Sequence, residues 1–147
     1  MKIHKSALVP YLPRDMFALV ADIEAYPEFL PWCTEARVLA RQGNQVTARV
    51  ALAKSGIRQS FVTRNVQKEC ERIDMHLVEG PFKRLRGFWS FEPVGSHGCV
   101  VALNLEFELA SKLLAVTFGK VFHSIANSLI DAFCTRAREL HERRSAF

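Results

Sequence analysis

The side chains best suited to a chemical role in this chain are aromatic and aliphatic. Its 147 residues include 11 phenylalanines and 2 tryptophans. A long lining of such side chains is what an elongated apolar ligand needs, because its binding comes mainly from buried apolar surface. The predicted lining residues are Phe29, Trp32, Phe61, Leu77, Leu85, Trp89, Phe91, Phe118, Phe122, Ile125 and Leu129. Each would equally suit an ordinary hydrophobic core, and the sequence leaves both interpretations open.

Patterns typical of catalysis or of metal binding are missing from the sequence. It contains no Gly-x-Ser-x-Gly elbow, no glycine-rich phosphate loop and no His-Glu-x-x-His pair. The five histidines are isolated, and His123 is better explained as a residue of a packed interface than as a general base. No zinc-type spacing joins the cysteines, which are Cys33, Cys70, Cys99 and Cys134. We therefore expect reduced thiols, no metal, no cofactor and no enzymatic activity.

Basic residues outnumber acidic ones in this chain. The formal net charge is +5 and the isoelectric point is near 9.3, which favours an anionic partner such as RNA or a lipid headgroup surface. Lys83, Arg84 and Arg86 follow Phe82, which we expect to be exposed, and this mixture suits phosphates or headgroups. A solvated basic edge is the alternative interpretation, and no DNA partner is expected.

The elements that must position these residues begin with a strand and two short helical segments. Residues 2–9 are β-prone, and Pro13 opens an apolar helical pattern. The segment AYPEFLPWC, residues 25–33, contains two prolines, which predict a short helical turn followed by a corner. Within it, the Tyr26 hydroxyl is a candidate donor to a ligand oxygen, although packing of the corner explains the segment as well.

From residue 34 to residue 109 the apolar residues recur with a period of two, which is typical of strands. The last strand is the clearest, because five apolar positions alternate with other residues between Val101 and Leu109. The predicted strands span residues 36–40, 46–52, 57–67, 72–79, 85–92 and 101–109. One face of the resulting antiparallel sheet is expected to be buried and the other to face solvent.

After Ser111, a good helix cap, the apolar period becomes helical. Apolar residues recur at spacings of three and four as far as Leu140, which predicts a helix of about 45 Å that crosses the whole sheet. Gly119 is the expected weak point near its start. The order of elements predicts one α+β domain over residues 1–147. A twisted sheet around the helix would leave an elongated apolar space between them.

Neither a membrane span nor an export signal is expected. No apolar run approaches the ~20 residues that cross a bilayer. The N-terminal segment MKIHKSALVPYLP has only a short apolar stretch that ends at prolines, unlike the core of a signal peptide. We therefore expect a cytoplasmic protein whose contact with the inner membrane, if any, is peripheral.

Four segments carry a family resemblance. They are AYPEFLPWC (residues 25–33), GPFKRLRGFWSF (80–91), LEFEL (105–109) and AFCTRAREL (132–140). In this order they resemble the coenzyme Q-binding START-domain family, which includes bacterial ribosome-association toxins. That family belongs to a larger group with polyketide cyclases and lipid-transfer domains. The match extends along almost the entire chain.

The resemblance implies a helix-grip fold, in which a curved antiparallel sheet of six or seven strands wraps a long C-terminal helix and encloses a hydrophobic tunnel. One implied function is binding of ubiquinone or a related polyprenyl lipid as a carrier or chaperone that supports respiration. Another is binding to the large ribosomal subunit, which interferes with subunit joining. A cyclase-type enzyme is less favoured, because the predicted inward positions are nearly all apolar.

Overall fold

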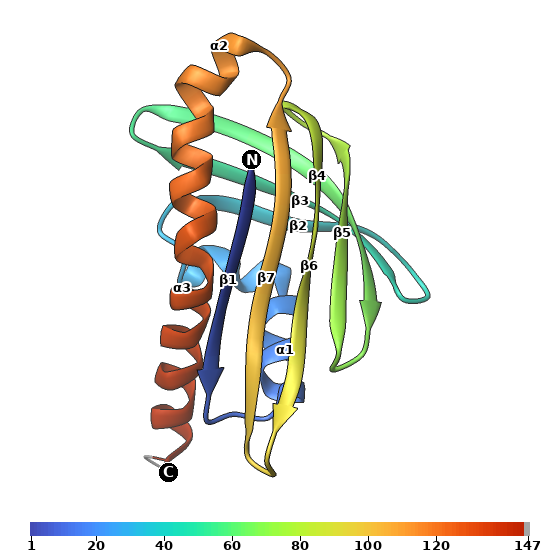
Figure 1. Ribbon diagram of the computed structural model, residues 1–147, viewed down its shortest axis with the longest axis vertical. Coiled ribbons are helices and arrows are strands. Elements are labelled where there is room, and N and C mark those ends of the chain that lie inside the picture. Colours follow the sequence, from blue (N-terminus) through green and yellow to red (C-terminus); the bar gives the residue numbers. More distant parts are fainter. Residues whose placement is uncertain (146–147) are drawn as a thin grey trace.

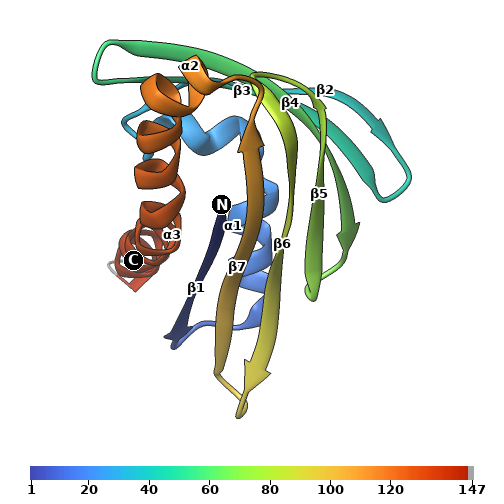
Figure 2. The ribbon, with the colours of Figure 1, turned by 45° about the horizontal axis from the view of Figure 1, so that its top comes forward.

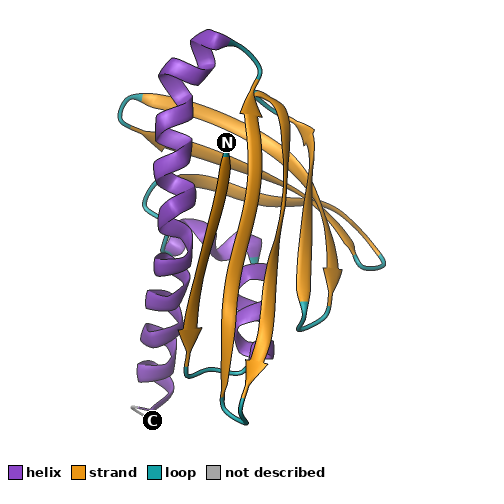
Figure 3. Ribbon diagram, viewed as in Figure 1, coloured by secondary structure: helices purple, strands orange, loops and turns teal. Residues whose placement is uncertain are grey.

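The computed structural model describes residues 1–145 as a long sheet and a set of helices (Figure 3). The strands are β1 (Lys2–Val9), β2 (Cys33–Gln42), β3 (Gln45–Lys54), β4 (Ile57–Lys68), β5 (Arg72–Glu79), β6 (Phe82–Val94) and β7 (Gly98–Leu109). The helical segments are α1 (Pro13–Ala21), the 3-10 helix η1 (Ile23–Glu28), α2 (Lys112–Leu114), the π-helical turn η2 (Ala115–Gly119) and α3 (Lys120–Ser145). The predicted elements are confirmed, and several strands extend a few residues beyond their predicted ends.

All seven strands of residues 1–145 form one antiparallel sheet in the order β1-β7-β6-β5-β4-β3-β2. The register shifts at four places in three of the strand pairings, and such bulges bend and twist a sheet. At Gly87 of β6 an added Cβ would lie 2.2 Å from the carbonyl oxygen of Asn104, so only glycine fits there. The long helix lies against the concave side of the bent sheet (Figures 1 and 2). The predicted helix-grip arrangement is therefore confirmed.

The C-terminal helical segment starts at the predicted cap but is not regular throughout. The backbone N–H of Leu114 donates to the Ser111 hydroxyl at 3.1 Å. A π-helical turn then occupies Ala115–Gly119 and ends at the glycine that was predicted to be the weak point. After this turn α3 continues without a break through Ser145.

The C-terminal helical segment is more apolar on average than expected from the sequence, which predicted no membrane span. By length and composition alone, Lys112–Arg144 qualifies as a helix that could cross a membrane, although no uninterrupted apolar run suggested one. The difference arises because isolated polar residues interrupt the run without making the average polar. Packing against the sheet explains part of its apolar content, since 33% of its most apolar window is buried.

Two groups of aromatic rings join the helix to the sheet. The first aromatic cluster consists of Phe61, Phe82, Phe107, Phe118 and Phe122, with ring centroids 4.8–6.3 Å apart. The second aromatic cluster consists of Tyr26, Phe29, Trp89 and Phe133, with centroids 5.2–6.2 Å apart. Most pairs meet edge to face, the geometry that the ring quadrupoles favour. The helix is thus held at two separate places along its length.

Replacement of Phe107 by alanine should lower the free energy of unfolding by about 3–5 kcal/mol. Its side chain is fully buried, and its ring packs on Phe82 and Phe122, so truncation leaves a cavity in the first aromatic cluster. Urea denaturation measures the effect. Leu39→Ala is the control, because Leu39 is 51% exposed and its truncation should change stability by less than about 0.5 kcal/mol. Equal losses in both variants would contradict the assignment of this cluster as a main anchor.

Candidate ligand-binding site

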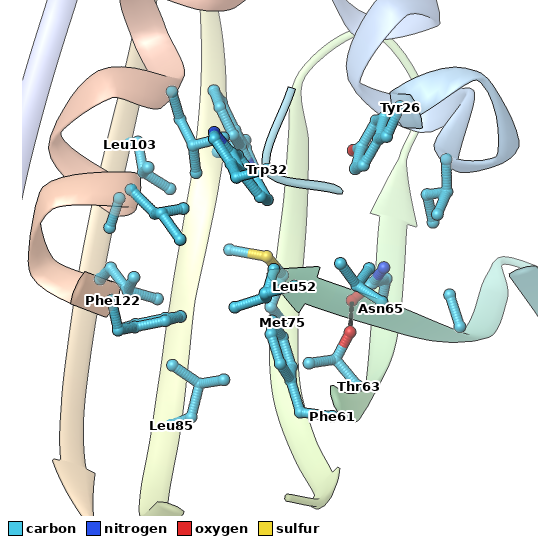
Figure 4. A pocket seen from close by; sticks show the side chains of 18 of the residues that line it. Tyr26, Trp32, Leu52, Phe61, Thr63, Asn65, Met75, Leu85, Leu103 and Phe122 are labelled. Carbon is cyan, nitrogen blue, oxygen red and sulfur yellow. Dashed lines mark hydrogen bonds between the residues drawn. The ribbon is translucent and has the colours of Figure 1, made fainter. Parts of the chain in front are cut away.

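A cavity of about 110 Å³ lies between α3 and the concave face of the sheet (Figure 4). Side chains from η1, the corner after it, strands β3 to β7 and the helix contribute to its wall. The wall residues are Ile23, Tyr26, Trp32, Ala48, Val50, Leu52, Phe61, Thr63, Asn65, Met75, Leu85, Trp89, Leu103, Leu105, Phe122, Ile125, Ala126, Leu129 and Phe133. The cavity is predominantly apolar, and both tryptophans of the chain face it.

Seven of the predicted lining residues meet at this cavity. They are Trp32, Phe61, Leu85, Trp89, Phe122, Ile125 and Leu129. The strand residues among them occupy inward positions of the period-two pattern, and the helix residues belong to the stripe that faces the sheet. Residues separated by almost one hundred positions in the sequence therefore share one surface.

The other four predicted lining residues lie outside the cavity wall. Phe29 packs in the second aromatic cluster, and Phe118 packs in the first. Phe91 is buried against Phe17 of α1, and Leu77 packs at the margin of the first cluster. Contacts with helix α1 and with the aromatic clusters cover much of the apolar surface of these four side chains, and their part in ligand binding stays a prediction.

Two polar wall residues were missed by the sequence analysis. Thr63 and Asn65 are each only 7% exposed, and the Thr63 hydroxyl donates to Asn65 Oδ1 at 3.0 Å (Figure 4). Both stand on β4 at inward positions, two and four residues after Phe61. The period-two alternation of the predicted strand 57–67 puts Asn65 on the same face as Phe61 and Thr63, so the sequence contained a signal for it. The hydrogen bond from Thr63 engages the amide oxygen of Asn65, and the same side chain forms part of the cavity wall.

Tyr26 contributes its ring rather than its hydroxyl to the site. The hydroxyl donates to the backbone carbonyl of Val20 and so holds η1 against α1. Burial raises the pKa of this hydroxyl above its ordinary value, so it stays protonated and acts as a donor. The corner-packing interpretation of this tyrosine therefore fits the structure better than donation to a ligand.

The predicted anionic-partner surface is largely compensated by carboxylates. Lys83, Arg84 and Arg86 of β6 lie 3.5–3.8 Å from Glu106 or Glu108 of the neighbouring strand β7. Phe82, expected to be exposed beside them, is only 5% exposed and belongs to the first aromatic cluster. The expectation of an exposed aromatic residue is wrong, because the β6–β7 register turns its ring toward α3.

The cysteines and acidic residues form no reactive centre within residues 1–145. No group of three His, Cys, Asp or Glu side chains there could hold a metal ion. Burial raises the pKa of the Cys33 and Cys99 thiols to about 11 each, so both remain protonated at neutral pH. Protonated thiols are poor nucleophiles and poor metal ligands.

Comparison with known proteins identifies the family of this chain. A family model described as polyketide cyclase / dehydrase and lipid transport matches residues 9–134. The ribosome association toxin RatA of Escherichia coli strain K12 is 42% identical over 143 residues, which cover 97% of this chain and 90% of that protein. The mitochondrial coenzyme Q-binding protein coq10 of Schizosaccharomyces pombe is 27% identical over 95% of this chain and 88% of its own length.

A solved structure supports the same assignment at the level of the fold. The START superfamily protein from Mycobacterium smegmatis superposes with a TM-score of 0.79 and 22% identity, over 95% of this chain and 98% of that chain. The predicted START-type resemblance is thereby confirmed, in sequence and in fold. The chain belongs to the polyketide cyclase / dehydrase and lipid transport family.

Proposed function

We propose that the cavity binds the ring of a hydrophobic quinone, ubiquinone or a related polyprenyl lipid, and that the protein is a carrier or chaperone for it. The observation that carries this proposal is an apolar space beside the helix whose wall includes the side chain of Asn65, with its amide oxygen already bonded to Thr63. Such a wall favours a flat apolar ring, and the amide can donate to one ring oxygen. The S. pombe relative is named as a coenzyme Q-binding protein, which supports the same ligand class.

The size of the cavity limits how much of such a ligand can enter. Its volume is about 110 Å³. An apolar cavity of about 150 Å³ accepts benzene in another protein, so this one suits roughly one substituted ring after small side-chain movements. A polyprenyl tail is several times larger and must extend out of the cavity or displace α3. We therefore assign the cavity to the head of the ligand rather than to its tail.

Hydrogen bonding explains why the ligand should carry an oxygen. A ligand carbonyl in the cavity would offer the amide nitrogen of Asn65 an acceptor that a hydrocarbon lacks. Thr63 holds the Asn65 side chain through its oxygen, so the nitrogen is oriented before the ligand arrives. A pure hydrocarbon would leave the donor unpaired and should bind less well than a quinone of equal size.

We propose a non-catalytic role for this site. The relatives named above are a toxin and a coenzyme Q-binding protein, although the family also includes cyclases. The cavity wall within the described residues includes the amide of Asn65 and the hydroxyl-bearing residues Thr63 and Tyr26, but no carboxylate, histidine, lysine or arginine. General acid–base chemistry needs a titratable group within hydrogen-bond reach of the substrate.

Association with the large ribosomal subunit is a second candidate function, favoured by the 42% identity to a ribosome association toxin. We place the contact on the outer face of β3 and β4, where Arg49, Arg58 and Arg64 are exposed. Within residues 1–145 none of these three forms an ion pair with a carboxylate, unlike Lys83, Arg84 and Arg86. Uncompensated guanidinium groups suit RNA phosphates. The cavity opens on the other face, so the two functions do not compete for one surface.

Filling the cavity should abolish quinone binding. Ala126→Phe puts a ring into the space, because Ala126 is buried and forms part of the wall. We expect titration with a short-tail ubiquinone to quench the fluorescence of Trp32 and Trp89 in the native protein, and the affinity of the variant to fall by about tenfold or more. Ala40→Phe, at an exposed position of β2, is the control and should behave as the native protein. Absence of quenching in the native protein would overturn the proposed ligand.

Asn65→Leu should weaken quinone binding by about threefold to tenfold, the value of one hydrogen bond of 0.5–1.5 kcal/mol. The leucine keeps the volume but removes the donor. The same titration with an aromatic hydrocarbon of similar size should show unchanged or tighter binding. Equal weakening for both ligands would mean that Asn65 acts through packing alone and would contradict its role as the donor.

Removal of the uncompensated arginines should weaken ribosome binding. Arg58→Gln with Arg64→Gln is expected to reduce co-sedimentation with large ribosomal subunits, and to lower the slope of log affinity against log salt by about 1.4–1.8. Lys83→Gln with Arg84→Gln is the matched control, since glutamates already compensate these charges. A larger loss in the control would move the contact to β6, and no co-sedimentation of the native protein would remove this function.

A further inference from the structure

The start of the C-terminal helical segment exposes apolar side chains that the fold does not use. We define residues 111–120, comprising α2, η2 and the two residues that flank them, as the helix tip; in Figure 1 α2 stands at the end of the molecule opposite the C-terminus. Leu113 is 73% exposed and Val116 is 71% exposed, the two highest values among large apolar side chains in residues 1–145. Ala115 is exposed as well.

Isolated exposed leucines are normal on protein surfaces, but this pair is not isolated. Leu113 and Val116 are three residues apart, so they are neighbours on one helical turn. Their backbone is held in place, since the Thr117 hydroxyl donates to the Leu113 carbonyl at 2.8 Å and Ser111 caps the segment. The tip is therefore an ordered apolar projection.

The exposed apolar side chains of the tip, Leu113 and Val116, are not needed to complete the core. Phe118 and Gly119, on the same π-helical turn, are already buried against the sheet. Only 33% of the most apolar window of the helical segment is buried, so packing explains a minority of its apolar content. The remaining apolar surface points to a partner outside this chain.

The charges around the tip identify the kind of partner. Lys112 and Lys120 are exposed at its two ends. No aspartate or glutamate occurs in the sequence between Glu108 and Asp131. Apolar side chains flanked by lysines suit the headgroup region of an anionic bilayer, where aliphatic groups enter the acyl boundary and ammonium groups meet phosphates. The centre of a protein interface is instead typically rich in aromatic residues and poor in lysine.

We propose that the helix tip inserts into the surface of an anionic lipid bilayer. The inference rests on the proposed function, because a carrier of a membrane lipid must meet the membrane that holds it. Phe118 of the tip contacts Phe122, with ring centroids 5.7 Å apart, and Phe122 forms part of the cavity wall. Insertion would therefore bring the bilayer within two helical turns of the ligand site.

Vesicle flotation with quinone-free phosphatidylcholine, with and without phosphatidylglycerol, tests the proposal. The native protein should float with the anionic vesicles, and Leu113→Gln with Val116→Gln should bind them about tenfold or more weakly. Lys112→Gln with Lys120→Gln should lose the preference for phosphatidylglycerol. Leu8→Gln with Leu39→Gln is the matched control, at leucines 69% and 51% exposed on β1 and β2, and should bind as the native protein does.

Two results would overturn the proposal. One is failure of the native protein to bind either kind of vesicle, and the other is an equal loss in the control pair. Titration of the tip variant with short-tail ubiquinone in vesicle-free solution separates this proposal from the function on which it rests. If ubiquinone still quenches the tryptophan fluorescence of this variant, the variant is folded and binds the ligand. Any change in its vesicle binding is then due to the tip alone.

Discussion

The attachment of one long helix to a curved sheet at two aromatic clusters is the constraint on which this structure depends. Phe122 belongs to the first cluster and Phe133 to the second. Eleven residues separate them, which corresponds to about 16 Å along the helix axis. Between them Ala126 is too short to reach the sheet, and Ile125 and Leu129 fill the space only in part. The cavity lies along this part of the helix, and both Phe122 and Phe133 contribute to its wall.

The same constraint explains how a polar pair is tolerated in an apolar wall. Sheet curvature separates β4 from the helix, so Thr63 and Asn65 face the cavity rather than a packed side chain. Their mutual hydrogen bond meets part of the cost of burying them. In the proposed function, the amide nitrogen of Asn65 would add selectivity to a site whose affinity comes from apolar contact. A few oriented polar groups in a largely apolar pocket are typical of small-molecule sites.

The chain separates its candidate interactions onto different surfaces. The cavity lies on the concave side of the sheet, the uncompensated arginines on the outer side of β3 and β4, and the apolar helix tip beyond the end of β7. An apolar ligand, an RNA surface and a bilayer therefore need not exclude one another. The bent sheet separates the cavity from the arginine surface, because its two faces have opposite character.

The sequence by itself determined the elements and their buried faces. Ser111 and Gly119 marked the start and the irregular turn of the last helix, and the alternation along Val101–Leu109 identified the strand that pairs with both β1 and β6. Periodicity contains this information because it records which side of each element avoids water. The same alternation along β4 also indicates the inward position of Asn65.

Only the tertiary structure decided which apolar residues surround empty space and which are filled. Phe91 and Phe118 have the same pattern signature as Trp89 and Phe122, yet the first two are packed and the last two line the cavity. The burial of Phe82 and the pairing of Arg84 with Glu106 were equally hidden. These outcomes depend on strand register and on the distance between helix and sheet, and periodicity along one chain specifies neither.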